Sequence, residues 1–213
     1  MSKLRFRISI SLDGYTSGAH QSTKEPLGVG GERLHEWAIS LAAWRAPHGL
    51  EGGEVNENTA IFGELLANIG ATIMGRNMFG GHPGPWDSAK PWAGWWGGDP
   101  PFHHPVFVVT HHPRPRLELR NGNSFTFVSD GIESALAQAR QAAGGKDVAL
   151  AGGATIAREY LNAGLVDEMM LHQVPVLLGA GERLFEGVED LRGLALTRVV
   201  AAPGVTHLRF ERH

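Results

Sequence analysis

The chain has 213 residues, of which 42% are hydrophobic, and this is enough to bury the core of one large domain. Its 19 basic and 22 acidic residues form no long run of either sign, so we expect neither nucleic acid nor a membrane surface as a partner. The chain lacks cysteine, which excludes disulfides, thiolate metal sites and a cysteine nucleophile. It shows no apolar leader and no apolar run of the roughly 20 residues needed to cross a bilayer, so we expect one cytoplasmic domain over residues 1–213.

The first part of the chain predicts a strand followed by two helices. Apolar and polar residues alternate over 6–11, which is typical of a strand with one buried face, and Asp13 with Gly14 indicates a turn after it. Apolar residues recur at helical spacing over 30–46 and again over 59–69. Each of these two patterns predicts a helix that packs one face against a core.

The middle of the chain is irregular. A short buried strand is predicted over 71–74, and the residues over 75–105 are then rich in Gly, Pro and Trp with no sustained period. An irregular segment of this length inside a compact domain usually carries function. Short apolar runs over 106–109 and 125–128 predict two more buried strands.

The last part of the chain continues the alternation and then changes to antiparallel strands. The predicted elements are a helix over 132–143 with Asp130 as its N-cap, a strand over 148–151, a helix over 154–163, a strand over 166–178 interrupted near Pro175, and a hairpin of 196–202 with 206–212. Together the elements indicate an α/β fold with a mostly parallel, mixed central sheet, flanking helices and an antiparallel C-terminal hairpin.

A glycine pair marks a candidate phosphate-binding turn. A predicted strand runs into Gly152 and Gly153, and a predicted helix begins directly after them. Glycines let the backbone approach a ligand closely, and the free N–H groups of a helix start attract phosphate. The alternative is an ordinary strand-to-helix turn, because a Gly-Gly pair is less specific than a full dinucleotide fingerprint.

Two further strand ends carry polar residues. A buried strand ends at Gly75 and is followed at once by Arg76, whose guanidinium could pair with the extra phosphate that distinguishes NADPH from NADH. Arg76 could equally be a surface arginine. A third strand end offers Thr110 and His111. Ligands of open α/β sheets bind at the carboxyl ends of the strands, so all three strand ends indicate the same ligand-binding edge.

Six ordered motifs carry a resemblance to a known family. They are Ser11-Leu12-Asp13-Gly14, Met74-Gly75-Arg76, Val109-Thr110, Gly152-Gly153-Ala154-Thr155, Leu165-Val166-Asp167-Glu168 and Pro175-Val176-Leu177-Leu178-Gly179-Ala180-Gly181. In this order they resemble the dihydrofolate reductase-like family, most closely the reductase domain of the bifunctional deaminase-reductase of riboflavin biosynthesis. The resemblance covers nearly the whole chain and implies NADPH bound across the strand ends, with hydride transfer to a pyrimidine- or pterin-like ring. Since the chain shows no deaminase zinc ligands, we expect only the reductase part.

The resemblance also implies which residues contact each part of the ligands. They are Gly75, Arg76 and Asn77 for the adenosine phosphates, Thr110 and His111 for the adenine, Gly152, Gly153, Ala154, Thr155 and Ile156 for the pyrophosphate, Leu12, Gly14 and Tyr15 for the nicotinamide, and Gly179 and Gly181 for the reacting ring of the substrate. A homodimer is expected from the same branch of the family and from the apolar run over 169–178.

Hydride transfer needs a proton from a positioned acid or from water. Asp13, after the first strand, and Glu36, expected on the inner face of its helix beside Trp37, are the candidate acids. Asp13 could instead be a turn residue that bonds its own backbone, and Glu36 a solvated helix carboxylate.

The segment Gly80–His104 holds four of the chain's six tryptophans and is expected to be an ordered lid over the substrate, with Trp95 and Trp96 in contact with it. The same aromatic side chains could instead cover a hydrophobic patch or a dimer interface. The histidine pairs at 103–104 and 111–112 do not have the spacing of metal ligands, so no metal is expected.

The leading hypothesis is therefore an NADPH-dependent oxidoreductase that reduces a small heteroaromatic or carbonyl substrate. A non-catalytic module of the same fold that binds NADPH or another ligand is the alternative, and a flavin-binding reductase is a third.

Overall fold

The computed structural model describes residues 2–81, 84–89 and 92–212. By their contacts the residues divide into two compact units, each assembled from separate stretches of chain. The first unit comprises Met1–Phe6, Asn68–Asp167 and Val188–Arg192, and the second comprises Arg7–Ala67, Glu168–Gly187 and Gly193–His213. Strand β1, Leu4–Ser11, contributes residues to both units. One domain over the whole chain stays a prediction.

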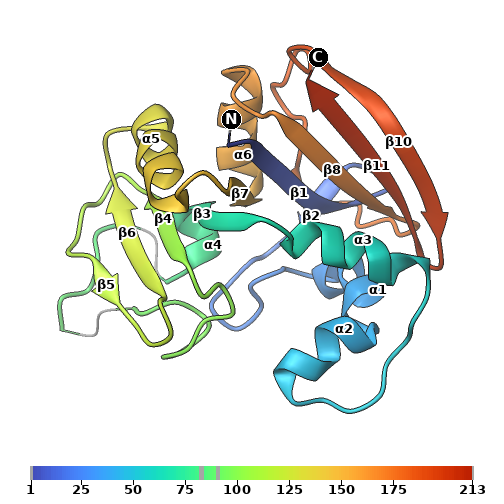
Figure 1. The fold of residues 1–213 in the computed structure, drawn as a ribbon, viewed down its shortest axis with the longest axis horizontal. Coiled ribbons are helices and arrows are strands. Elements are labelled where there is room, and N and C mark those ends of the chain that lie inside the picture. The colour runs from blue at the N-terminus through green and yellow to red at the C-terminus, as the bar shows by residue number, and fades with distance from the viewer. Residues whose placement is uncertain (1, 82–83, 90–91, 213) are drawn as a thin grey trace. The chain divides into compact units, whose positions relative to one another are not determined.

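The first unit is built on a mostly parallel sheet (Figure 1). Besides β1, its strands are β3 (Ile69–Gly75), β4 (Pro105–Val109), β5 (Leu117–Glu118), β6 (Ser124–Val128) and β7 (Asp147–Gly152). They lie in the order β1-β7-β3-β4-β6-β5, and each neighbouring pair is parallel except β5 with β6. The four strands expected here are confirmed, whereas β5 was not predicted because a two-residue strand carries no periodicity.

Helices cover this sheet because each presents an apolar face to it. The helices are α4 (Arg76–Phe79), α5 (Ile132–Ala143) and α6 (Ala154–Asn162), and α5 packs against β3 and β4 through residues that include Leu136 and Ala139. The helix predicted over 132–143 is confirmed. Its N-cap is Gly131 rather than Asp130, whose carboxylate instead accepts a hydrogen bond from the Ser134 hydroxyl at 2.7 Å.

Apart from β1, the strands of the second unit pair with one another in antiparallel fashion. Its strands besides β1 are β2 (Tyr15–Gly18), β8 (Glu168–Val174), β9 (Gly181–Arg183), β10 (Leu194–Ala202) and β11 (Val205–Arg212). The order is β10-β11-β8-β1, and β2 pairs with β9. The C-terminal hairpin is confirmed. The strand predicted over 166–178 ends at Val174, since Pro175 has no N–H to continue the ladder.

The single helix predicted over 30–46 is wrong. The chain forms a 3-10 turn (Gly31–Leu34), then α1 (Glu36–Ile39) and α2 (Ala42–Arg45), because Leu41 is extended at φ −71° and ψ 138°. The backbone of Glu54 bonds on both sides of Leu41: its N–H donates to the Ser40 carbonyl at 2.8 Å, and its carbonyl accepts from the Ala42 N–H at 2.9 Å. A competing backbone pairing therefore replaces the helical bonds.

The apolar pattern of this region nevertheless holds. Leu34, Trp37 and Leu41 lie in one hydrophobic cluster together with Leu65 of α3 (Glu57–Leu66) and Met170 of β8. The helix predicted over 59–69 corresponds to α3, which begins at Glu57 and ends at Leu66. Spacing thus identified which residues face the core but not the path of the backbone.

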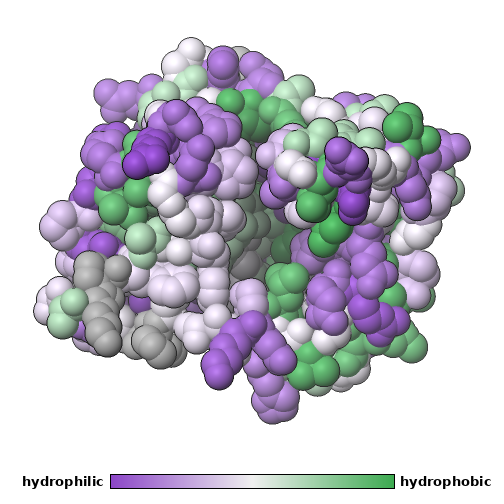
Figure 2. All heavy atoms as spheres, turned by 90° about the horizontal axis from the view of Figure 1, so that it is seen from below, coloured by the Kyte–Doolittle hydropathy of each residue, from purple (hydrophilic) through white to green (hydrophobic). Residues whose placement is uncertain are grey.

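Large hydrophobic side chains also reach the surface of the second unit. They include Leu12, Val29, Leu177, Leu196 and Val199. On the face drawn in Figure 2, hydrophobic residues lie among hydrophilic ones. Among the described residues, no helix is long and apolar enough to cross a membrane, and no group of three or more His, Asp or Glu side chains could hold a metal ion.

Candidate functional site

The three strand ends predicted to bind the cofactor lie at one edge of the first unit's sheet. Gly75 at the end of β3 pairs in register with Val109, so Arg76 and Thr110 follow from neighbouring strands. Met74 pairs with Gly152 at the end of β7. This is the arrangement in which the carboxyl ends of parallel strands form a ligand edge.

The turn from β7 into α6 leaves room for a ligand. Gly153 caps α6, and a Cβ added there would meet nothing within 4 Å. The peptide bond between Gly152 and Gly153 is cis, and Gly152 has a φ of 109°. The first N–H groups of a helix have no intrahelical partners, so α6 presents donors and a positive dipole end beside this open space. A phosphate group fits these features.

The start of α6 packs tightly against the end of β3. A Cβ added at Gly75 would lie 3.2 Å from the Ile156 side chain, so a larger residue here would push that side chain back by a few tenths of an ångström. Ala154 and Ile156 are buried, whereas Thr155 is exposed and its hydroxyl accepts a hydrogen bond from Arg158 at 3.3 Å. Of the three predicted residues in this turn, Thr155 alone presents its side chain to solvent.

Arg76 is held by the tryptophan-rich segment. Its guanidinium carbon lies 3.5 Å from the centroid of the Trp86 ring, and its Nη1 donates to the Gly80 carbonyl. Burial lowers the pKa of Arg76, and the nearby Arg114 cation lowers it further. Arg76 is therefore a half-buried, oriented arginine, and the alternative of an ordinary surface arginine does not describe it.

A second arginine lies beside the same tryptophan and was not singled out from the sequence. The guanidinium carbon of Arg114 lies 4.8 Å from both the Trp86 and Phe127 ring centroids, and its Nη1 donates to the Trp92 carbonyl at 2.7 Å. The sequence signal for it was weak, because Arg114 stands between two prolines in an irregular stretch.

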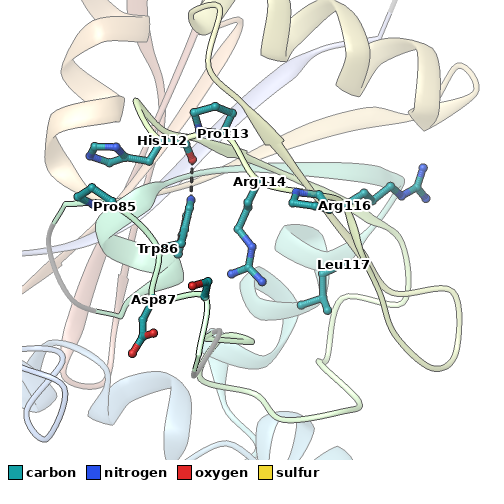
Figure 3. Close-up of a pocket in the computed structure, with 10 residues that line it drawn as sticks. Pro85, Trp86, Asp87, His112, Pro113, Arg114, Arg116 and Leu117 are labelled. Carbon is teal, nitrogen blue, oxygen red and sulfur yellow. Dashed lines mark hydrogen bonds between the residues drawn. The ribbon is translucent and has the colours of Figure 1, made fainter.

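Arg114 lines an open cavity of about 530 Å³ (Figure 3). The cavity is formed by residues that include Trp86 and Asp87 on one side and the segment 112–117 on the other. In Figure 3 the Arg114 side chain lies between Trp86 and Leu117, and the Trp86 indole N–H donates to the His112 carbonyl at 2.6 Å. The cavity thus offers an aromatic wall and a cation.

The other predicted residues of this edge differ in exposure. Thr110 is buried, and its hydroxyl accepts from the His112 N–H at 3.1 Å. Asn77 and His111 are exposed. Thr110 therefore shapes the turn after β4, and contact of Asn77 and His111 with a cofactor stays a prediction.

The described residues of the tryptophan-rich segment pack as part of the first unit's core. The segment expected as a lid, Gly80–His104, includes 82–83 and 90–91, which lie outside the described residues. Trp96 lies 5.0 Å from Phe102 and 6.1 Å from Phe125, centroid to centroid. The Trp95 indole N–H donates to the Met78 carbonyl at 3.0 Å. These contacts favour the alternative of a covered hydrophobic patch, and contact of Trp95 and Trp96 with a substrate stays a prediction.

In the second unit the structure brings together two loops predicted for the nicotinamide and the reacting ring. The Asp13 carboxylate accepts from the N–H groups of Leu178 at 3.2 Å and Gly179 at 2.7 Å, and from the Ser11 hydroxyl at 2.6 Å. The Tyr15 hydroxyl donates to the Gly179 carbonyl at 3.3 Å. We call these bonded loops, Leu12–Tyr15 and Leu178–Gly179, the Asp13 clamp.

These bonds set the charge of Asp13. Burial acts to raise its pKa, but the hydrogen bonds from Ser11, Gly179 and Leu178 outweigh it and lower the pKa from 3.8 to about 2. Asp13 is consequently an ionised acceptor at neutral pH, which fits the turn role better than that of a proton donor.

The remaining predicted residues near this clamp are exposed or shape the backbone. Leu12 is 55% exposed, and its N–H donates to the Val176 carbonyl at 3.0 Å. Gly14 follows in the turn, and its carbonyl accepts from the Leu184 N–H at 3.1 Å. Gly181 pairs with Gly18 in the small sheet of β2 and β9.

The expected placement of Glu36 on the inner face of its helix is wrong. Glu36 is exposed at the start of α1, and the inward residue there is Trp37, which is 6% exposed. Because α1 has only four residues, the phase assumed for a long helix does not apply. His35 is the partly buried titratable neighbour, and burial lowers its pKa.

The fold is similar to several solved structures. A putative riboflavin biosynthesis protein from Shewanella sp. PV-4 shares 23% identity at a TM-score of 0.60, covering 100% of this chain and 99% of that one. RibD of Acinetobacter baumannii shares 17% at 0.59, and this chain spans 58% of its length. Dihydrofolate reductase from Enterococcus faecalis, solved with NADP(H), shares 13% at 0.53 over 99% and 96% of the two chains. The protein therefore has a dihydrofolate reductase-like fold.

The family is shown by the sequence itself. The model of the RibD C-terminal domain matches residues 2–208, so the chain belongs to that family. A curated relative, the uncharacterized protein YyaP of Bacillus subtilis (strain 168), is 32% identical over 96 residues. That match covers 43% of this chain and 50% of the relative.

Proposed function

We propose that this protein is an NADPH-dependent reductase that transfers hydride to a small heteroaromatic or carbonyl substrate. The observation that carries the proposal is the start of α6, where β7 ends and the space beside Gly153 is open. Free N–H donors and a helix dipole at the carboxyl edge of a parallel sheet suit a pyrophosphate. A relative of the same fold was solved with NADP(H), which supports this reading.

In this proposal the first unit holds the phosphates of the cofactor. Residues 152–156 bind the pyrophosphate, and Arg76 binds the extra phosphate of NADPH, with Arg114 as a second cation near it. Stacking on Trp86 orients both guanidinium groups before a ligand arrives. Bound NADPH would supply a hydride.

The proton required by the reduction comes from water in this proposal. The Asp13 carboxylate is ionised and already accepts three hydrogen bonds, so it has no proton to give at neutral pH. The same observation favours the second candidate, a module that binds NADPH without catalysis. Turnover distinguishes the two.

Calorimetric titration with NADPH and NADH tests the cofactor part. Gly153→Val places a side chain in the open space beside α6 and should weaken NADPH by about a hundredfold or more. Gly63→Val is the matched control, because a Cβ added at Gly63 in α3 also meets nothing within 4 Å. Normal NADPH binding by folded Gly153→Val would place the cofactor elsewhere.

The same titration tests the cofactor preference. Arg76→Ala should weaken NADPH by about 10- to 100-fold, the value of a charged hydrogen bond, and leave NADH nearly unchanged. Since both cofactors are titrated into the same variant, any loss of stability from the missing Trp86 contact affects the two affinities equally. Equal losses for both would remove Arg76 from this role. NADPH oxidation with a panel of pterins, pyrimidines and carbonyl compounds then separates a reductase from a binding module.

A further inference from the structure

Three polar side chains form a hydrogen-bonded chain in the core of the second unit. His172 on β8 and His207 on β11 are register partners, and their Nδ1 atoms lie 2.7 Å apart. The Nε2 atom of His207 lies 2.8 Å from Oδ1 of Asn58 on α3. His172 is 3% exposed, and His207 and Asn58 are each 1% exposed. We call Asn58, His172 and His207 the buried triplet.

The hydrogen bonds fix the protonation of both imidazoles. The Asn58 amide nitrogen donates to the Pro203 carbonyl at 3.1 Å, so its Oδ1 is the acceptor for His207 Nε2–H. A neutral His207 then carries a lone pair on Nδ1, and His172 must donate to it from Nδ1–H. This leaves a lone pair on His172 Nε2, which is buried and has no hydrogen-bond partner among the described residues.

The surroundings of the triplet oppose any added proton. The Trp37 ring on α1 lies 4.7 Å from His172 and 5.0 Å from His207, centroid to centroid. Burial lowers the pKa of His172 well below 6.5, and His207, Arg7 and His35 add to that effect. Burial also lowers the pKa of His207 to about 4, helped by Arg198 and opposed by Glu64.

We propose that the buried triplet is an acid-sensitive lock, which holds α1 and α3 against β8 and β11 only while both imidazoles are neutral. One added proton on His207 Nδ1 turns it into a donor, so His172 must accept at Nδ1 and carry its own hydrogen on Nε2. That N–H is buried without an acceptor, and a cation is buried with it. A second proton sets two N–H groups against each other at 2.7 Å.

Unfolding by urea at several pH values tests the lock. In the unfolded chain both histidines take up protons near pH 6.5, whereas the folded chain resists, so stability falls as the pH drops from about 6.5 toward 4. The unfolding equilibrium constant should rise by up to about tenfold per pH unit for each histidine. His207→Gln keeps a donor and an acceptor but does not titrate, so the rise of the unfolding constant with falling pH should be smaller by the contribution of one histidine. The control is His111→Gln, at an exposed position, which should leave the pH dependence unchanged.

Hydrogen exchange shows which part of the protein loses stability at low pH. At pH 4.5 the backbone amides of α1, α3, β8 and β11 should lose protection before those of β3, β4 and β6. Equal pH dependence in the wild type and in His207→Gln, or uniform loss of protection in both units, contradicts the lock.

Nitrogen-15 NMR of the histidines in the wild-type protein tests the protonation states directly, so it is informative even if the variants fail to fold. At pH 7.5 we expect a hydrogen on Nδ1 of His172 and on Nε2 of His207, with both rings still neutral at pH 5.5. If either ring titrates near pH 6.5 in the folded protein, the proposal is wrong.

Discussion

In the turn that follows β1, Asp13 uses its carboxylate to join two loops rather than to supply a proton. Its oxygens accept from Ser11, Leu178 and Gly179. Because these bonds connect the two loops, the position of one loop depends on the other. Both loops were predicted to border the reacting groups. We infer that Asp13 acts on the proposed reaction by positioning these loops.

Replacing Asp13 by Asn tests this role. Asn offers an N–H₂ group where the clamp supplies donors, so we expect a loss of about 1.5–3 kcal/mol of unfolding free energy at pH 6, the usual value of hydrogen bonds to a charged group. The pKa of Asp13 in the folded protein is about 2, below its value in the unfolded chain. Its contribution is therefore complete above about pH 4 and is lost as the pH falls through 2.

Urea unfolding of the wild type and of Asp13→Asn at pH 6 and pH 2 measures this difference. The gap between the two proteins should narrow to a small remainder at pH 2, where about half of Asp13 is protonated in the folded protein. A proton donor would behave otherwise: Asp13→Asn would keep full stability at pH 6 and lose turnover.

At the scale of elements, the described residues of the segment from Gly80 to His104 form part of a core. Trp96 packs against Phe102 and Phe125, and the hydrophobic cluster that it joins includes the buried Phe79 and Val108. Composition predicted correctly that the segment packs, because disordered segments cannot bury large aromatics. Whether another part of it also contacts a substrate depends on side-chain directions that composition does not carry.

Trp96→Ala should therefore lower the free energy of unfolding by roughly 2–4 kcal/mol, as expected for removing a largely packed aromatic. Denaturant unfolding followed by circular dichroism measures the loss. Pro101→Ala, at an exposed position of the same segment, is the control and should change stability little. A folded Trp96→Ala protein of unchanged stability but altered substrate preference would instead support the prediction that the segment is a substrate lid.

At the scale of the whole molecule, the homodimer expected from the sequence stays a proposal, but one reason for it fails. The apolar strand used for that argument is β8, which pairs with β11 and is buried, with Met169 0% exposed. The exposed apolar residues of the outer strand are instead Leu196 and Val199 on β10. An interface between two copies would cover these side chains.

Light scattering at micromolar concentration measures the assembly. We expect twice the mass of one chain, and Leu196→Lys with Val199→Lys should reduce it to one chain by placing charges in the contact. Thr197→Lys, a neighbouring exposed position on β10, tests whether any added charge has this effect. A monomeric wild type contradicts the dimer, and a dimeric double variant moves the interface away from β10.

The sequence by itself determined most strands and helices of the first unit, though not the short β5 and α4, and the glycine turns at their ends, because periodicity and glycine placement are local properties of the chain. It also determined the resemblance that led to the family. Only the tertiary structure decided the break at Leu41, where Glu54 supplies the competing bonds, and the pairing of Arg114 with Trp86. The bond between His172 and His207 likewise depends on strand register. In each case the partners are distant in the sequence, and no local pattern specifies which side chain a residue will meet.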